Sequence, residues 1–505
     1  MNENLYSLIL SRFPEDRSAP FMMLPSGRNV SWTETDQGSA RMAAVLAGSG
    51  VVPGDRVVVQ TGKSPEAVML YLACLRLGCI YIPLNTAYTP TEVDYFLGNA
   101  EPKVLVCRPG SVEGLTGIAE KAGVARTFVM DAEGKGSLTD EAAAATPLDD
   151  IALCDKDDLA AILYTSGTTG RSKGAMLSHE NLSSNAQTLH RIWAFEPGDV
   201  LLHALPIYHV HGLFVALHCA LMNGSSIHFL DKFDPATVIG LLPKSTVMMG
   251  VPTFYTRLLD DPAFTADACQ TMRLFVSGSA PMLAETHVLF TERTGHKILE
   301  RYGMTEGGMI TSNPYDGDRV PGTVGPALPD VSVRICDKDG QPVAAGEIGV
   351  LEYKGPNLFK GYWRMPEKTA EEFRDDGFFI SGDNAIMDED GRVSIVGRDK
   401  DLIITGGYNV YPKEIEIEID QMNGVVESAV IGLSHKDFGE GVTAVVVAKA
   451  DAGITEQEII QALEGKLARF KQPKRVFFVE ELPRNAMGKV QKNALRETFA
   501  STYLS

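Results

Sequence analysis

The chain lacks the apolar run that a membrane-spanning helix needs. A spanning helix takes about 20 consecutive apolar residues, whereas the longest apolar tracts, such as residues 213–222, are soon interrupted by His or Gly. The first residues also lack the basic and apolar regions of a signal peptide, and no Arg-rich amphipathic presequence is visible. We therefore expect no membrane partner and a cytoplasmic location.

Positive charge is also scarce. The chain has 46 Lys and Arg against 65 Asp and Glu, which gives a formal net charge of −19. A nucleic-acid partner demands a basic surface, so we expect none. Small anionic substrates need only a local basic pocket and stay open.

Paired cysteines and a single compact core are excluded as well. The seven cysteines contain no C-x-x-C pair, which suits reduced thiols better than a disulfide framework or a zinc site. At 505 residues the chain is too long for one core, so two or more domains are expected. The sequence leaves the oligomeric state open.

A Walker-type phosphate loop is absent too, but another phosphate-binding pattern is present. Residues 160–164 are a short apolar run typical of a buried strand, and a helical pattern begins at Ser178. The loop between them, residues 165–174, holds three glycines, five hydroxyls and two cations. Glycines let backbone N–H groups approach an anion, hydroxyls donate, and cations neutralise charge. A solvated turn is the simpler alternative, and the density of these groups favours phosphate.

Strands alternate with helices of ten to fifteen residues over most of the chain, which predicts βαβ units and a mostly parallel sheet. The weakly patterned stretch 109–150 is expected to be peripheral. The expected strands are 56–60, 79–83, 103–107, 201–205, 246–250, 273–277, 297–301 and 475–480, and the expected helices are 65–77, one from Pro90, 235–242, 252–259 and 282–293.

Polar clusters follow four of these strands, where ligands sit in open α/β sheets. They are residues 206–212, 250–253, 277–281 and 300–306. Each cluster alone is a weak signal, because a lone His near apolar residues is usually a satisfied structural group. Their common position after strands is what indicates a site.

The loop and the later motifs resemble those of the adenylate-forming enzymes, which include acyl-CoA synthetases, luciferases and peptide-synthetase adenylation domains. Tyr-Gly-Met-Thr-Glu at 302–306, Ser-Gly-Asp at 381–383 and Gly-Arg-Asp-Lys-Asp at 397–401 match the family in order. Residues 406–416 resemble its pantetheine tunnel, and Pro-Arg-Asn-Ala-Met-Gly-Lys at 483–489 resembles its last motif. The resemblance covers nearly the whole chain.

The resemblance implies two domains of α/β class. The first, 1–398, has mostly parallel sheets flanked by helices and binds ATP and the acyl substrate. The second, 399–505, is a small mobile α+β domain with its hinge near Lys400. It presents Lys489 for adenylation and then rotates so that thioester formation can follow.

The resemblance also implies site roles. Tyr302 stacks on adenine, Asp383 binds ribose, and Glu306 holds Mg²⁺, because a carboxylate beside polyphosphate needs a cation between them. The implied catalytic residues are Lys489, Thr305, Glu306 and His209. The implied ATP site is Thr165, Ser166, Gly167, Thr168, Thr169, Gly170, Lys173, Ser279, Ala280, Glu300, Tyr302, Gly303, Thr305, Asp383, Arg398 and Lys489. CoA contacts are assigned to Gly406, Gly407, Tyr408 and Lys471.

One residue departs from the common family pattern. The position before the Tyr302 motif lines the acyl pocket and is often small or apolar, whereas here it is Arg301. A buried guanidinium needs an anion. Lys489 already takes the reacting carboxylate, so a second carboxylate is the expected partner, with His209, Ser277 and Arg257 as helpers. An internal salt bridge, for instance to Glu300, is the alternative.

A small dicarboxylate is therefore expected, and residues 205–212, 250–257, 300–306 and 313–319 also resemble malonyl-CoA synthetases. The expected reaction joins malonate, ATP and CoA through an acyl-adenylate, with methylmalonate as a side substrate. Two alternatives stay open: a synthetase for another small acid, and an adenylation enzyme that loads a separate carrier protein. A catalytically dead regulator is disfavoured, because Lys489, Glu306 and Asp383 are intact.

Overall fold

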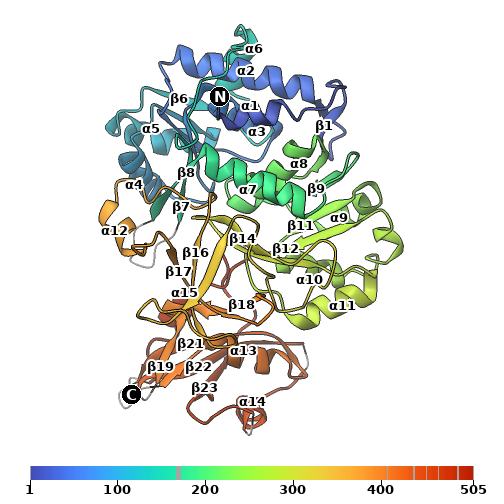
Figure 1. Cartoon of the computed structure of the whole chain (residues 1–505), viewed down its shortest axis with the longest axis vertical. Helices are drawn as coiled ribbons and strands as arrows, with labels where there is room; N and C mark the ends of the chain where they lie inside the picture. Colours follow the sequence, from blue (N-terminus) through green and yellow to red (C-terminus); the bar gives the residue numbers. More distant parts are fainter. Residues whose placement is uncertain are drawn as a thin grey trace.

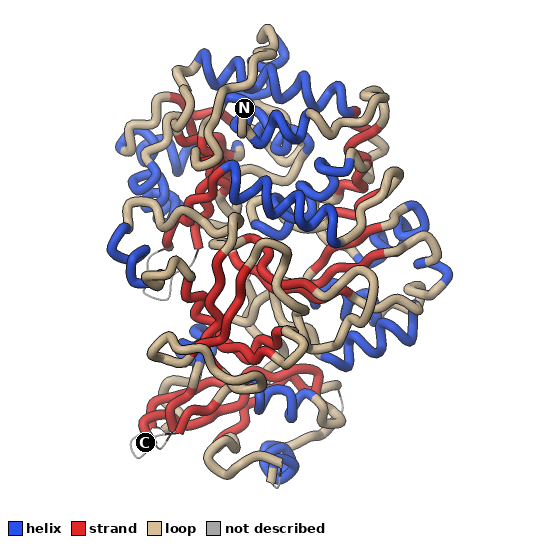
Figure 2. The backbone as a smooth tube through the Cα atoms, viewed as in Figure 1, coloured by secondary structure: helices blue, strands red, loops and turns tan. Residues whose placement is uncertain are grey.

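The structure is a computed structural model that describes residues 2–165, 172–405, 408–435, 438–450, 452–464, 466–485 and 488–503. In this described part the strands form four sheets. Two large sheets with flanking helices occupy the upper part of Figure 1, and the strands and helices beyond residue 402 gather below them. In Figure 2 the helices lie mostly outside the strands of the upper part. This arrangement confirms the expected α/β class with a smaller carboxyl-terminal part.

The first large sheet has the strand order β6-β5-β3-β4-β7-β8. Its neighbours pair in parallel except for the antiparallel hairpin β7–β8. The bounds are β3 (Arg56–Gln60), β4 (Ile80–Pro83), β5 (Val104–Cys107), β6 (Arg126–Val129), β7 (Leu159–Thr165) and β8 (Lys173–Ser178). The accompanying helices are α1 (Leu5–Leu10), α2 (Trp32–Gly48), α3 (Pro65–Leu77), α4 (Pro90–Ala100), η1 (Pro109–Ser111), α5 (Val112–Lys121), α6 (Ser137–Ala144) and α7 (His179–Ile192).

Local capping explains why the helices in this half begin where the sequence predicts. Ser64 accepts the N–H of Ala67 with Pro65 in the first turn of α3, and Thr89 and Glu92 form a capping box at α4. Both patterns satisfy backbone N–H groups that a helix start leaves free.

The sequence prediction missed regular structure at two places in this half. The loop does not lead directly into the helix at Ser178, because Lys173–Ser178 form β8 and return antiparallel to β7. The stretch has no β-branched residue to signal a strand, and only pairing with β7 reveals one. Residues 109–150 also contain regular structure, since β6 extends the sheet and α5 and α6 cover it.

The second large sheet has the order β14-β13-β12-β11-β9-β10-β1-β2. Its strands pair in parallel from β13 to β1, and an antiparallel strand lies at each edge. The strand bounds are β1 (Pro20–Met23), β2 (Asn29–Ser31), β9 (Val200–His203), β10 (Ser226–Phe229), β11 (Val247–Gly250), β12 (Leu274–Ser277), β13 (Leu299–Met304) and β14 (Gly308–Ser312). The helices are the π-helix η2 (His211–Leu217), α8 (His218–Asn223), α9 (Pro235–Leu241), η3 (Leu242–Lys244), α10 (Pro252–Leu259), η4 (Asp267–Cys269) and α11 (Ala284–Thr294).

Two smaller sheets complete the described structure. One is antiparallel, with β15 (Ser332–Cys336), β16 (Gly349–Lys354), β17 (Phe379–Met387) and β18 (Val393–Arg398), and α12 (Pro366–Glu371) precedes β17. The other contains β19 (Ile403–Thr405), β20 (Tyr408–Val410), β21 (Val425–His435), β22 (Gly439–Ala448) and β23 (Arg475–Phe478). The last helical elements are η5 (Asp399–Asp401), α13 (Pro412–Asp420), α14 (Glu456–Leu463) and α15 (Lys492–Thr498). Within the described ranges no helix is both long and apolar enough to cross a membrane.

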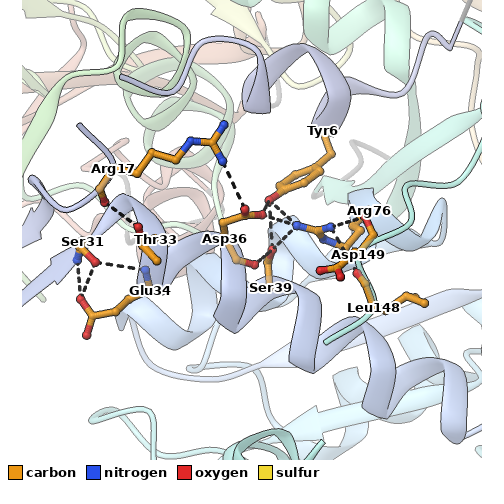
Figure 3. Close-up of polar contacts among 10 residues, drawn as sticks. All are labelled: Tyr6, Arg17, Ser31, Thr33, Glu34, Asp36, Ser39, Arg76, Leu148 and Asp149. Atoms are coloured by element: carbon orange, nitrogen blue, oxygen red, sulfur yellow. Dashed lines mark hydrogen bonds and ion pairs between the residues drawn. The ribbon is translucent and has the colours of Figure 1, made fainter. Parts of the chain in front are cut away.

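A buried polar network joins the amino-terminal helices (Figure 3). Arg76 of α3 is only 3% exposed, and it pairs with Asp36 of α2. Its Nη2 also donates to the Tyr6 hydroxyl at 2.8 Å, and its Nη1 donates to the carbonyl of Asp149 at 3.0 Å. The guanidinium therefore ties three helices and a crossing segment together.

Candidate active site

The four polar clusters lie side by side at one edge of the second large sheet. Strands β13, β12, β11 and β9 are consecutive neighbours and pair in parallel. Their carboxyl ends therefore meet at the same edge, where ligands bind in open α/β sheets. The Gly278 N–H donates to the Gly250 carbonyl at 3.3 Å, which joins two of the clusters directly.

Arg301 is the central unpaired charge of this edge. It is 3% exposed, and no described carboxylate lies within ion-pair distance of it. Its Nε and Nη2 have no hydrogen-bond partner within the described ranges. Burial lowers the pKa of Arg301 to about 9, while Tyr255 and Cys219 nearby oppose the shift. The guanidinium thus carries a desolvation cost that no described anion offsets.

Gly278 makes room for this guanidinium. A Cβ at residue 278 would lie 2.4 Å from Cζ of Arg301, which no real contact tolerates. The expected internal partner, Glu300, is engaged elsewhere: His287 Nδ1 lies 3.1 Å from its Oε1, and the Gly322 N–H donates to the same atom at 3.3 Å. The alternative of an internal salt bridge is therefore not found in the described structure.

Two more buried polar atoms without a described partner belong to the same edge: Nε2 of His211 and Oγ of Ser277. His211 Nδ1 lies 3.2 Å from Oγ of Ser279, a residue with a φ of 72°. Burial holds the pKa of His211 well below its usual range, and Arg301 lowers it further. His211 is therefore a neutral imidazole facing this cluster. The sequence prediction named His209 and not His211, because spacing alone does not distinguish the two histidines of the motif.

Contacts of His203 hold the segment that carries His211. His203, at the end of β9, lies with Nε2 2.8 Å from the Gly212 carbonyl, at the start of the π-helix. Lys63 Nζ lies 2.8 Å from its Nδ1. Lys63 follows β3, so this contact also joins the two large sheets. Neither Lys63 nor His203 was expected at the site.

Lys489 reaches this edge from the carboxyl-terminal part. Its side chain is accessible to solvent, yet protein surrounds it closely enough that burial lowers its pKa, with Arg398 as the next cause. It also interacts with Asp383, Glu306 and Arg301. Burial and the Lys489 charge lower the pKa of His209 to about 4. Lys489 therefore lies close enough to act electrostatically on His209, and His209 is neutral at pH 7.

Arg257 is not brought to this cluster. It lies in the last turn of α10 with an exposed side chain. No described hydrogen bond or ion pair joins it to Arg301, Ser277 or His211. Helix α10 begins at the site with Pro252 and leads away from it.

The predicted nucleoside residues form a compact cluster. The Tyr302 hydroxyl donates to Oδ2 of Asp383 at 2.5 Å, and Arg398 Nε lies 2.8 Å from Oδ1. Asp383 and Arg398 face each other across β17 and β18. Burial raises the pKa of Tyr302 well above its usual range, and Asp383 adds to the shift.

The predicted phosphate residues lie at the end of the other large sheet. Thr165 ends β7 opposite Lys173 of β8, while Ser166, Gly167, Thr168, Thr169 and Gly170 lie outside the described residues. Glu306 is buried and accepts the Tyr362 hydroxyl at 3.0 Å. Gly303 belongs to β13, and Thr305 lies in the turn between β13 and β14. In the sequence, Thr305 therefore lies between Tyr302 and Glu306. Ala280 directly follows Ser279.

Glu306 suits the predicted cation although it stands without a ligand cluster. No group of three His, Cys, Asp or Glu side chains is arranged for a metal in the part of the chain that is described. Mg²⁺ is usually held by one or two carboxylates together with substrate phosphates, so a single buried glutamate fits it.

The predicted CoA residues are spread over the carboxyl-terminal part. Gly406 and Gly407 lie outside the described residues. Tyr408 is 57% exposed and stacks on Phe470 at 4.5 Å between ring centroids. Lys471 Nζ donates to both oxygens of Glu414, at 2.6 and 2.8 Å, so its charge is already paired. Lys400 is exposed in η5.

Comparison with known proteins places this geometry in context. Residues 10–363 match the family model of the AMP-binding enzymes, and residues 414–489 match that of the AMP-binding enzyme C-terminal domain. The chain is 35% identical to a malonate–CoA ligase of Arabidopsis thaliana, over 90% of this chain and 79% of the relative. It is 57% identical to MatB from Rhodopseudomonas palustris, with both chains fully covered and a TM-score of 0.97 to the ATP-bound crystal structure. The apo structure of the same MatB gives a TM-score of 0.85 at the same identity and coverage.

Proposed function

Because this chain belongs to the family of AMP-binding enzymes, we propose that it is an AMP-forming acyl-CoA ligase that acts on malonate. The overall reaction is ATP + malonate + CoA giving malonyl-CoA + AMP + diphosphate, through malonyl-AMP. Relatives named malonate–CoA ligase support this substrate. Methylmalonate is the proposed side substrate, because one extra methyl group changes discrimination by only about 1–3 kcal/mol.

The assignment of malonate as the substrate rests on the unpaired side chain of Arg301. A dicarboxylate brings one carboxylate to be activated and a second that Arg301 neutralises. Ser277 Oγ and His211 Nε2, both buried and free of described partners, are available to bind the same group. A monocarboxylate such as acetate leaves Arg301 without its anion, and it should be rejected strongly for that reason.

For the first half-reaction, we assign Lys489 to the space between the reacting carboxylate and the α-phosphate. Its ammonium lowers the repulsion between two anions that must meet and stabilises charge that develops on the phosphate. Malonate itself is the nucleophile, so no side chain has to form a covalent bond. Glu306 would hold Mg²⁺, which when bound neutralises charge on the phosphates.

For the second half-reaction, we assign residues 399–505 to a rotation about Lys400. Lys489 then leaves, and the segment that includes Tyr408 approaches so that the CoA thiol can attack the acyl-adenylate and release AMP. The higher similarity to the ATP-bound than to the apo form of MatB supports the described arrangement as that of the adenylation step. The cytosol is the proposed compartment, where free thiols such as the seven buried cysteines persist.

The test is AMP release by purified protein with malonate, methylmalonate or acetate, each with and without CoA. We expect malonate to be preferred over acetate by at least about a hundredfold in kcat/KM, since a buried charge left unpaired costs several kcal/mol. AMP release with acetate equal to that with malonate would contradict the dicarboxylate. Release of diphosphate with malonate but no release of AMP when free CoA is added would instead favour a carrier-loading enzyme.

A further inference from the structure

Lys173 is already occupied by a carboxylate of the protein. The lysine is 8% exposed, and its Nζ lies 2.8 Å from Oε1 of Glu372. The ammonium also lies 4.1 Å from the centre of the Tyr362 ring. Glu372 is 199 positions away in the sequence, and it was not expected at the site.

The partner is held in place by the fold. Residues 361–363 run beside β8: the Met176 N–H donates to the Gly361 carbonyl at 3.0 Å, and the Trp363 N–H donates to the Gly174 carbonyl at 2.8 Å. This pairing carries Tyr362 to Lys173 and leads into α12, whose C-cap is Glu372. The ion pair is thus built on two adjacent backbone segments.

Glu372 has two further polar contacts. The Tyr362 hydroxyl lies 2.7 Å from its Oε2 and 3.0 Å from Oε1 of Glu306. Because a phenol has one proton, it donates fully to only one of these carboxylates at a time. Lys368 Nζ lies 3.1 Å from Oε1 of Glu372, one helical turn away. Glu372 therefore keeps a counter-ion when Lys173 is drawn away.

A polyphosphate and Glu372 compete for the same ammonium. A phosphate on Lys173 would bring its negative charge within about 5 Å of the carboxylate, where like charges repel strongly in a partly buried site. We propose that Glu372 is a positioning residue for product release: it yields Lys173 to the β- and γ-phosphates of ATP and takes it back from diphosphate. The inference rests on the proposed function and on the prediction from the sequence that Lys173 belongs to the ATP site.

The test is the affinity for Mg-diphosphate, measured by calorimetry and as product inhibition against ATP in the malonate reaction. In Glu372→Gln the competing charge is gone while the shape is kept. If the paired state holds about nine-tenths of Lys173 in the free enzyme, diphosphate should bind about tenfold more tightly. The KM for ATP should fall as well, and the KM for malonate should stay within about twofold, since Arg301 does not contact this pair.

Glu371→Gln is the matched control. Glu371 lies one residue away with a side chain 65% exposed, and it contacts Lys368 at 2.9 Å but has no described contact with Lys173. It removes the same charge from the same helix end, so it reports the general field effect. We expect it to change diphosphate affinity less than about twofold, as a solvent-screened charge should.

The outcomes separate the two proposals. Equal diphosphate affinity in E372Q, E371Q and the parent enzyme would overturn the role of Glu372. Weaker diphosphate binding in E372Q would also overturn it, and would mean that Glu372 orients Lys173 for phosphate. Failure of the parent enzyme to use malonate would contradict the proposed function alone, because calorimetry with Mg-diphosphate needs no acid.

Discussion

Arg76 and Arg301 are equally buried, at 3% exposure each, but they differ in whether an anion accompanies them. Arg76 has Asp36, the Tyr6 hydroxyl and two backbone carbonyls as partners (Figure 3). Arg301 has no described anion, and two of its nitrogens have no described partner. In the first region Arg76 joins helices, whereas in the second region the charge of Arg301 has no described counter-ion.

The difference indicates which buried charge serves stability and which serves a ligand. Removing one partner of a buried ion pair is strongly destabilising, because the other charge stays buried and alone. Removing a charge that is already alone removes a desolvation cost instead. A ligand carboxylate at Arg301 would supply the partner that the fold withholds.

The largest effect is expected for Arg301→Met on malonate activity. The side chain keeps a similar volume and loses its charge, so the second carboxylate of malonate is left unpaired in a dry site. We expect kcat/KM for malonate to fall about 10³-fold, by analogy with sites built to bind a polar group. The KM for ATP should change less than about threefold.

Stability should respond in the opposite sense to activity at this position. The free energy of unfolding of Arg301→Met in urea should equal or exceed that of the parent protein. Arg257→Ala is the control, because its exposed side chain predicts a malonate activity within about twofold of the parent. Comparable losses of malonate activity in Arg301→Met and Arg257→Ala would contradict the proposed role of Arg301 in binding malonate.

Arg76→Met should produce the reverse pattern. Asp36, Tyr6 and two carbonyls would lose their common donor, and we expect the free energy of unfolding to fall by about 3 kcal/mol. The side chain of Asp36 is 25% exposed, which limits the loss. Steady-state kinetics at a temperature where the variant is folded should match the parent. A selective loss of malonate affinity in this variant would mean that the two regions are not independent.

A lower pH should reduce the stability of the two regions by different amounts, because each contains a histidine whose pKa is lowered by burial. Burial lowers the pKa of His179 to about 4, partly opposed by Asp158, against about 6.5 in an unfolded chain. Between these values the unfolded chain binds a proton that native His179 does not, so the free energy of unfolding falls as the pH drops from about 6.5 to about 4. His179→Gln should remove about 2 kcal/mol of the loss between pH 7 and pH 5.

The same change at the site should have a smaller effect. The pKa of His209 is also lowered to about 4, but its side chain is partly accessible, so solvent screens the cost of its protonation. Urea unfolding at pH 7 and pH 5 for His179→Gln and His209→Gln measures both terms. A larger acid effect at His209 would reverse the expected order of the two regions.

Much of the fold follows from local sequence signals. The expected strands near residues 56, 80, 104, 247 and 274 are present, because short apolar runs bounded by turn residues report buried parallel strands directly. Helix starts at Pro65 and Pro90 follow from their caps. Strand β8 was not predicted, because it has no β-branched residues and only its pairing with β7 identifies it as a strand.

The sequence by itself determined the enzyme class and the unusual Arg301. The enzyme class can be recognised from short contiguous motifs, because each motif places its backbone and side-chain groups within one loop. That Arg301 lacks an acid, that His211 and Ser277 share its edge, and that Glu372 pairs with Lys173 were decided only by the tertiary structure. The physical reason is that a charge is paired or unpaired according to every residue that folding brings within a few ångströms, and most of these residues are far away in the chain.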